Sequence, residues 1–289
     1  EEQIQLEDLQ LSEDLSEYEF RSAEMQSLFP KVEHGGPKEF LYNLEKLRKS
    51  VDVPVIASLN ALYDTTWVEY ARELEKTGID GLELNLYAVP GYYETKGSSI
   101  EEKQLKIVKA VKEAVNISVS VKISLFYSNL LNFVFNLDKA GADGYVLFNR
   151  FFQPEIDIEK EEFHYTWELS NPKDYMLSLR FAGLLFGNVK GSVGLNRGIF
   201  TGKDVIKSFL AGADAVQIVS TVYKNKPEII AEMLSELSDW MDRKGYENID
   251  SFKGKLSRKS MKDPYVYQRA QYVDILMKSE TIFKKYLMI

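Results

Sequence analysis

Short apolar runs that end in polar residues alternate along this chain with stretches whose apolar residues recur every three or four positions. The first pattern predicts buried strands, and the second predicts amphipathic helices. The predicted strands are Val53–Asn60, Leu82–Asn85, Ser118–Ser124, Tyr145–Phe148, Lys190–Leu195 and Ala215–Ser220. The predicted helices are Lys38–Ser50, Trp67–Lys76, Ile100–Ala114, Asn129–Ala140, Leu179–Phe186, Thr201–Ala211, Pro227–Lys244 and Val266–Lys278. Strands that alternate with helices form a parallel sheet.

Three turns before predicted strands have similar sequences: Thr77–Gly81, Ala140–Gly144 and Ala211–Ala215. Such repetition, at a period of roughly 30–45 residues, marks successive βα units. An open dinucleotide-binding sheet would carry a glycine-rich fingerprint after its first strand, and none is present. A (β/α)₈ TIM barrel explains the repeat and the polar strand ends better. Because six strands are counted, the alternatives are an open six-stranded sheet and a barrel whose first two βα units are absent from this sequence.

We expect a single domain over residues 1–289. Residues 1–50 form a lid or helical lead-in, residues 51–245 form six βα units, and residues 246–289 form a C-terminal helical extension. Ile4–Gln10 is predicted to be part of the lead-in. Thr65 or Thr66 is expected to cap the second helix. An irregular insertion follows the fourth strand, and its acidic run from Glu155 to Glu162 predicts a solvated loop.

Composition narrows the classes of function. The net charge of −8 disfavours nucleic acid or an anionic membrane as the main partner. The absence of cysteine excludes disulfides, thiolate metal sites and cysteine nucleophiles, and two histidines make a His-rich metal centre improbable. No apolar run is long enough to span a bilayer, and the first twenty residues do not resemble a signal peptide. The cytoplasm is therefore the expected compartment.

Polar residues mark the ends of four predicted strands, where a barrel gathers its active site. They are Ser58 and Asn60, Glu83 and Asn85, Lys122 and Ser124, and Asn149 and Arg150. Lys122 is the sharpest candidate, since an ammonium inside an apolar strand is costly without a partner. It can form a Schiff base, or stabilise negative charge on a cofactor ring or substrate. The structural alternative is an exposed strand edge or an ion pair with Glu83.

The asparagines at strand ends can hydrogen-bond a flat heterocycle, or simply cap their strands. Two later loops suggest a phosphate site, because loops after the last two strands of this barrel use backbone N–H groups and a helix N-terminus to hold phosphate. These loops contain Asn196–Gly202 and Val219–Thr221. The alternative for Gly198 is an ordinary glycine turn before a helix.

Several of these segments, in this order, resemble the dihydroorotate dehydrogenase family, and most closely its dihydroorotate dehydrogenase-like branch. They are Val55–Asn60, Leu82–Asn85, Val119–Ser124, Val146–Pro154, Leu210–Asp214 and the tail Lys244–Leu256. The resemblance covers nearly the whole chain. It implies an FMN-binding (β/α)₈ barrel, an oxidoreductase acting on CH–CH bonds, and a connection with pyrimidine biosynthesis. The family's amino-terminal strands have no counterpart here, which agrees with two missing units.

The resemblance also implies roles for individual residues. Lys122 would stabilise the negative charge of the reduced flavin, and Asn85 and Asn149 would contact flavin or substrate. The cofactor-binding set would be Asn85, Lys122, Ser124, Asn149, Asn196, Arg197, Gly198, Val219, Ser220 and Thr221. The substrate-binding set would be Asn60, Asn85, Asn149 and Arg150. A homodimer and a separate electron-acceptor protein are the expected partners beside a small-molecule substrate.

Departures from the family pattern fall mostly on the substrate side. Ala88 stands where the dehydrogenases carry a Cys or Ser base, and an alanine cannot accept a proton. Pro90 replaces a substrate-binding asparagine, Arg150 a small residue, and Arg197 a glycine of the phosphate loop. Tyr87 or Tyr93 is the remaining candidate for an acid/base hydroxyl. Three functions stay open: an FMN oxidoreductase that acts on a dihydropyrimidine-like or other small planar substrate, a non-catalytic or repurposed flavin-binding barrel, and a lysine-dependent aldolase or lyase.

Overall fold

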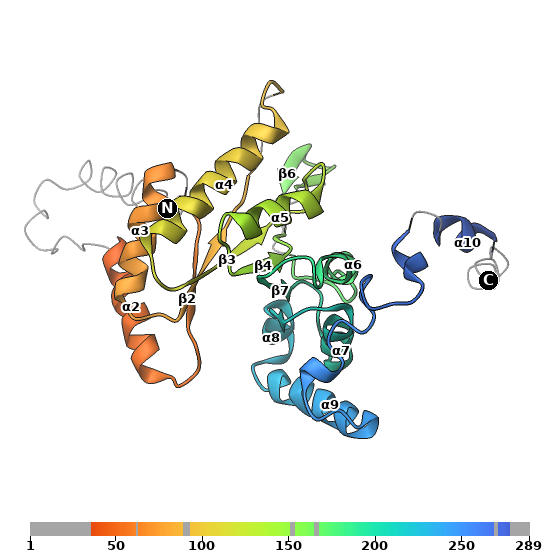
Figure 1. The fold of residues 1–289 in the computed structure, drawn as a ribbon. Coiled ribbons are helices and arrows are strands. Elements are labelled where there is room, and N and C mark those ends of the chain that lie inside the picture. Colours follow the sequence, from red (N-terminus) through yellow and green to blue (C-terminus); the bar gives the residue numbers. More distant parts are fainter. Residues whose placement is uncertain are drawn as a thin grey trace, which may run out of the picture. The chain divides into compact units, whose positions relative to one another are not determined.

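The computed structural model describes residues 36–277, except positions 62, 89–92, 151–153, 165–167 and 269–270. The predicted lead-in helix Ile4–Gln10 lies outside this range, as does Pro90. Contacts group the described chain into two compact units. Unit 1 runs to Lys122 and includes Lys139–Asp143, while unit 2 contains Ile123–Asp138 and everything from Gly144 onward. Figure 1 labels most of their helices and several of their strands. The predicted domain boundaries stay a prediction.

Unit 1 is built from parallel strands that alternate with helices, because each strand carries a short buried apolar run. Its elements are α2 (Gly36–Ser50), β1 (Ile56–Leu59), α3 (Asp64–Lys76), β2 (Gly81–Asn85), α4 (Gly97–Ala114) and β3 (Ser118–Ile123), whose last residue groups with unit 2. Strand β2 lies between β1 and β3 in parallel register. Leu82, Leu84, Val119 and Val121 are fully buried, so they form the core around this central strand.

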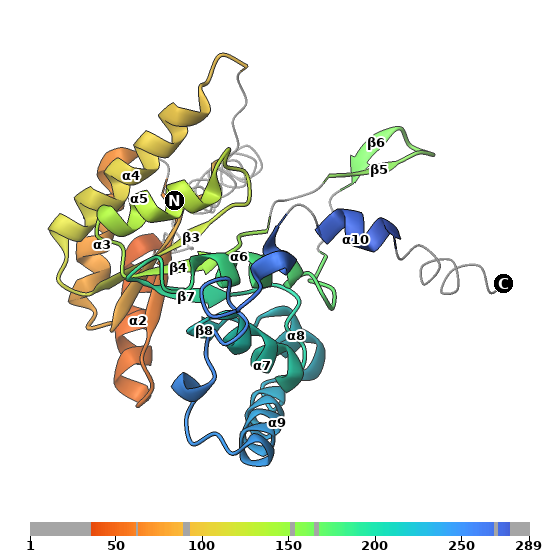
Figure 2. The ribbon, with the colours of Figure 1, turned by 45° about the vertical axis from the view of Figure 1, so that its right-hand side comes forward.

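Unit 2 continues the alternation of strand and helix. Its main elements are α5 (Leu130–Lys139), β4 (Gly144–Leu147), α6 (Met176–Leu185), β7 (Ser192–Leu195), α7 (Gly202–Ala211), β8 (Ala215–Val216), α8 (Ser220–Asn225) and α9 (Ile229–Lys244). Strand β7 pairs in parallel with β4 and β8. A C-terminal segment adds η1 (Ile249–Ser251), η2 (Pro264–Tyr267) and α10 (Gln271–Met277). Figure 2 shows α9 lying alongside α7, which it contacts.

The structure corrects three local predictions. Strand β8 ends at Val216, and Ser220 already begins α8, so Val219–Thr221 does not end a strand. The acidic run after β4 is an exposed antiparallel hairpin, β5 (Glu155–Asp157) with β6 (Glu162–His164), instead of a loop. Helix α3 begins after Tyr63 without a side-chain cap, because Thr65 and Thr66 already lie inside the helix, where the Thr66 hydroxyl donates to the Tyr63 carbonyl.

Each of the three similar turns contains an aspartate that forms two hydrogen bonds with the neighbouring strand. The aspartate N–H donates to a carbonyl oxygen, and its carboxylate accepts the N–H of that same residue. The pairs are Asp80 with Val55, Asp143 with Val119 and Asp214 with Val193, at 2.7–2.9 Å. Each carboxylate also pairs with a cation, Arg48, Lys112 or Lys253. We call these contacts the aspartate clamps. They fix strand register at the amino ends of the strands.

Within the part of the chain that the structure describes, no helix has both the length and the hydropathy needed to cross a bilayer. The same residues bring together no group of three or more His, Asp or Glu side chains suited to a metal ion.

Candidate functional site

Unit 1 gathers predicted site residues at the carboxyl ends of its strands. Parallel register places Ser58 beside Glu83 and Asn85 beside Lys122. The Lys122 Nζ lies 3.7 Å from Glu83 Oε1, and the Ser58 hydroxyl donates to the same oxygen at 3.1 Å. We call Ser58, Glu83, Asn85 and Lys122 the Lys122 cluster. The ion pair that the sequence offered as the structural alternative is therefore present.

Burial decides what the Lys122 cluster can do chemically. The Glu83 side chain is 6% exposed, while that of Lys122 is 23% exposed. A carboxylate so deeply buried needs its cation, and that cation keeps one side open to a ligand. A lysine paired with a carboxylate is placed to stabilise negative charge on a ligand, whereas a Schiff base would need the lysine as a free nucleophile.

Two further predicted residues of unit 1 flank this cluster. Asn60 is exposed immediately after β1, and Tyr87 is half-buried two residues after β2. The N–H of Leu86 donates to the Lys122 carbonyl at 3.0 Å, so β3 continues to hold the chain just beyond β2. Ala88, also half-buried, follows directly. Its methyl group carries no proton-transfer chemistry.

The loop after β7 in unit 2 contains buried polar atoms that no protein group satisfies. Among the described residues, Asn196 Oδ1 and Arg197 Nε are buried without a hydrogen-bond partner. Asn196 is 8% exposed. Leaving such an atom unpaired costs about 1–3 kcal/mol, so each atom is a place where a ligand would be stabilising. We call Asn196, Arg197 and Gly198 the Arg197 loop.

Arg197 occupies a backbone conformation that ordinarily belongs to glycine. Its φ is +68°, and that of Gly198 is +63°. Burial lowers the pKa of Arg197; the Asp174 carboxylate opposes this shift, and the positive charge of Arg150 adds to it. The positive charges of Arg197 and Arg150 therefore act on the same region of unit 2. That arrangement favours an anion.

Gly198 is required by close packing as well as by its backbone angle. A Cβ atom there would lie 2.4 Å from the Asn171 carbonyl oxygen and 2.7 Å from the Asp174 nitrogen. The Arg197 loop therefore rests directly on residues 171–174, which belong to the insertion after β4. A side chain at position 198 would push the loop away from this support.

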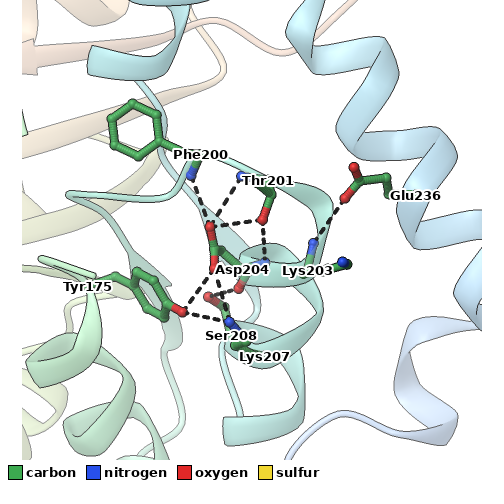
Figure 3. Close-up of polar contacts among 8 residues, drawn as sticks. All are labelled: Tyr175, Phe200, Thr201, Lys203, Asp204, Lys207, Ser208 and Glu236. Atoms are coloured by element: carbon green, nitrogen blue, oxygen red, sulfur yellow. Dashed lines mark hydrogen bonds and ion pairs between the residues drawn. The ribbon is translucent and has the colours of Figure 1, made fainter. Parts of the chain in front are cut away.

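Carboxylates of the protein already occupy the start of α7 (Figure 3). The backbone N–H groups of Phe200 and Thr201 donate to Asp204 Oδ2, each at 3.2 Å, and the Thr201 hydroxyl accepts from the Asp204 N–H. The Lys203 N–H donates to Glu236. These are the donors that a phosphate at a helix N-terminus would use. An anion in this region would therefore bind the Arg197 loop instead of the start of α7.

Asp204 is held in its ionised form by the same network. Burial alone would raise its pKa, but hydrogen bonds from Tyr175, Phe200, Thr201 and Lys207 outweigh burial and lower the pKa below its usual value. The Tyr175 hydroxyl donates to Asp204 Oδ1 at 2.9 Å, which ties the start of α6 to α7. Burial raises the pKa of this tyrosine, so its hydroxyl remains a donor.

The segment at the start of α8 also uses its side chains for structure. The Ser220 hydroxyl accepts the Ser170 N–H at 2.9 Å. Thr221 is buried, and its hydroxyl accepts from Asn225. Val219 precedes the helix without a side-chain cap. A ligand at this segment would therefore meet backbone groups.

The remaining predicted residues follow β3 and β4. The Ser124 hydroxyl accepts the Phe126 N–H in a local turn, and the Asn149 N–H donates to the Ile123 carbonyl at 2.8 Å. Arg150 binds both the backbone carbonyl and the carboxylate of Glu168. Glu168, Ser170 and Asp174 could not be predicted as part of this region, because they lie in the insertion and follow no periodic pattern.

Comparisons with known proteins agree with this architecture. Residues 32–241 match the profile of a family described as Dihydroorotate dehydrogenase. The catalytic subunit of dihydroorotate dehydrogenase B (NAD(+)) of Caldicellulosiruptor saccharolyticus is 27% identical over 233 residues, covering 78% of this chain and 76% of that protein. The same subunit of Thermoplasma volcanium is 30% identical over 214 residues, covering 72% and 70%.

A solved structure is similar in fold. The crystal structure of DHODH in complex with ferulenol from Eimeria tenella aligns with a TM-score of 0.58 and 18% identity, covering 76% of this chain and 68% of that chain. Together with the alternating parallel strands and helices, this likeness confirms the α/β, TIM-barrel-like fold class predicted from the sequence.

Proposed function

Since the chain belongs to the dihydroorotate dehydrogenase family, we propose that it is an FMN-dependent oxidoreductase that acts on a CH–CH bond of a small planar substrate. The observation that carries this proposal is the Lys122 cluster: a partly exposed ammonium at the end of a strand, held by a buried carboxylate. When bound, FMN would supply the ring that accepts a hydride. The residues of the chain would bind, orient and charge-stabilise the reactants.

Lys122 would hold negative charge near the electron-accepting edge of the flavin. A fixed cation, aimed at developing charge and paired in advance with Glu83, stabilises that charge without reorganisation. Asn85, next to Lys122 in register, would hydrogen-bond the flavin or the substrate. Ser124 and Asn149 complete the residues that we assign to the ring.

The phosphate of FMN would bind the Arg197 loop and the start of α8. Support comes from Arg197 Nε, which is buried and unpartnered within the described chain. Its guanidinium would supply the charge for the phosphate, because Asp204 and Glu236 already accept the backbone N–H groups at the start of α7. Asn196, Gly198, Val219, Ser220 and Thr221 would contribute the remaining contacts. No metal is required.

The substrate side is proposed to differ from that of the true dehydrogenases. Asn60, Asn85, Asn149 and Arg150 are the residues that we assign to substrate. Ala88 removes the base that would take a proton from dihydroorotate, so oxidation of dihydroorotate should be very slow. Tyr87 is our candidate for the proton-transferring hydroxyl. Arg150 favours a carboxylated substrate.

Electron transfer would involve a second protein. The curated relatives reported above are named catalytic subunits. This chain has no cysteine and so cannot ligate an iron–sulfur cluster through thiolates. We therefore propose a separate subunit as electron acceptor, with a homodimer as the expected assembly of this chain and the cytoplasm as its compartment.

The decisive experiment is the absorbance spectrum of the purified protein. We expect bound flavin, or uptake of added FMN, with absorbance that bleaches on chemical reduction. Lys122→Met should retain flavin but shift its reduction potential to a more negative value, because the cation that stabilises the reduced ring is gone. A colourless protein that takes up no FMN would refute the proposal.

Ala88 favours a second candidate, a non-catalytic flavin-binding barrel. In that case FMN binds, but no dihydropyrimidine or cellular reductant reduces it. A Schiff-base aldolase or lyase is the third candidate. Borohydride with a panel of keto acids would trap a covalent adduct at Lys122 only if that function is correct.

A further inference from the structure

A cavity in unit 2 is lined by residues that belong to neither the Lys122 cluster nor the Arg197 loop. It has a volume of about 690 Å³, within the range of small-molecule sites. Three segments line it: the N-terminal half of α5, the end of α6 with the following turn, and the start of the segment after Ser257 (Figure 2 labels both helices). The polar lining residues are Asn129, Asn132, Asn188, Arg258 and Lys259, and the apolar ones are Leu131, Phe135, Leu184, Leu185 and Val189.

The charge of this lining is opposite to that of the whole protein. The chain carries −8, yet the cavity lining contains two cations and no carboxylate. Neither Arg258 nor Lys259 forms a salt bridge with any described residue. Lys259 donates to the Gly187 carbonyl at 2.8 Å, which uses one of its three N–H groups. The N-terminus of α5, where Asn129 caps the N–H of Asn132, adds positive potential.

The neutral groups offer complementary hydrogen bonds and an aromatic face. The Asn132 carbonyl oxygen accepts from Asn136, so its NH₂ group is the part that can donate to a ligand. Asn188 uses its NH₂ group on the carbonyls of Leu184 and Phe186, so its oxygen can accept. Phe135 is 43% exposed. One donor, one acceptor and one aromatic face are the groups that recognise a nucleobase.

We propose that this cavity binds a nucleoside monophosphate, with the phosphate on Arg258 and Lys259 and the base against Phe135. Guanidinium and ammonium groups bind phosphate through charge-assisted hydrogen bonds. Asn132 donates a hydrogen bond to the edge of the base, and Asn188 accepts one from it. The proposal is independent of the flavin chemistry, since none of the ten lining residues belongs to the Lys122 cluster or the Arg197 loop. A site of this kind, outside those two clusters, would sense a nucleotide without converting it.

Isothermal titration calorimetry with the four ribonucleoside 5′-monophosphates tests this site. At least one should bind with a dissociation constant on the order of 10–500 μM. The matching uncharged nucleoside and inorganic phosphate should each bind at least tenfold more weakly. Arg258→Gln and the double variant Arg258→Gln/Lys259→Gln should weaken the nucleotide tenfold or more. Lys255→Gln, an exposed lysine of the same segment outside the cavity, should change nothing.

Arg197→Gln separates this cavity from the proposed flavin phosphate site, because it should leave nucleotide affinity unchanged. Phe135→Leu, which keeps the apolar volume but removes the aromatic face, should weaken binding about fivefold or more. The proposal is overturned if no monophosphate binds at millimolar concentration. It is equally overturned if phosphate alone binds as tightly, or if Arg258→Gln has no effect while Arg197→Gln does.

Discussion

The Lys122 cluster and the Arg197 loop differ in whether their buried polar atoms have partners within the protein. In the Lys122 cluster of unit 1, the buried Glu83 carboxylate meets both Lys122 and Ser58. In the Arg197 loop of unit 2, Asn196 Oδ1 and Arg197 Nε are buried and unsatisfied by the described chain. The buried carboxylate of the first set is therefore satisfied within the protein, whereas the second set leaves buried atoms that a ligand could satisfy.

This difference suggests which region relies on the ligand. An internally paired charge cluster keeps its geometry whether or not a ligand is bound, so it can act on electrons with little rearrangement. Unsatisfied buried groups instead lower the stability of the free protein and return that free energy on binding. Four substitutions test this difference, and they are given in order of decreasing effect on stability.

Gly198→Ala should have the largest effect. The added Cβ would lie 2.4 Å from a carbonyl oxygen and would sit at φ +63°, so overlap and strain should together destabilise the protein by about 3 kcal/mol. The matched control is Gly245→Ala, where φ is +71° but nothing lies within 4 Å, and where about 1 kcal/mol is expected. Urea unfolding measures both. Equal losses would mean that the Arg197 loop is not seated on residues 171–174.

Lys122→Met should destabilise by about 2 kcal/mol, less than a fully buried pair because the lysine is partly exposed. The loss arises because the Glu83 carboxylate is left buried without its cation. In Lys122→Met/Glu83→Gln the carboxylate is gone as well, so most of the stability should return. If the double variant is as unstable as the single one, Lys122 contributes through packing and the cluster is not a charge pair.

Asp204→Asn should cost about 1.5 kcal/mol at pH 7, because the α7 cap loses its charged acceptor. The folded-state pKa of Asp204 is lowered, so its contribution is fully present above the unfolded value of about 4 and disappears as pH falls through the folded value. The difference between wild type and variant should therefore shrink below about pH 4. A constant difference from pH 3 to pH 7 would show that the charge of Asp204 is not involved.

Arg197→Gln should have the smallest effect on the free protein, from zero to a gain of about 0.5 kcal/mol, since it removes a half-buried cation with an unsatisfied Nε. Its effect on binding should be larger: FMN affinity should fall about tenfold while riboflavin affinity stays the same. Flavin fluorescence titration gives both constants. If the affinities for FMN and riboflavin fall equally, the phosphate does not bind this loop.

The sequence predicted the elements whose signal is local. Buried runs such as Leu82–Asn85 gave the strands, and apolar periodicity gave the helices within a few residues. The β5–β6 hairpin was missed because its alternation is masked by exposed acidic residues. The pairing of Lys122 with Glu83 was foreseen as an alternative, since adjacent parallel strands bring such residues together. The burial of Arg197 was not, because it depends on a left-handed loop conformation and on the insertion beneath it.

The aspartate clamps have a consequence for how the chain acquires its shape during synthesis. Each clamp joins residues only 25, 24 or 21 positions apart, so it can close soon after one βα unit has emerged from the ribosome. A slip of one residue would lose the carboxylate contact and turn the strand's apolar side chains to the wrong face. The register of each strand is therefore set at its amino end as each βα unit forms. The residues at the carboxyl ends of the strands can then change without disturbing folding.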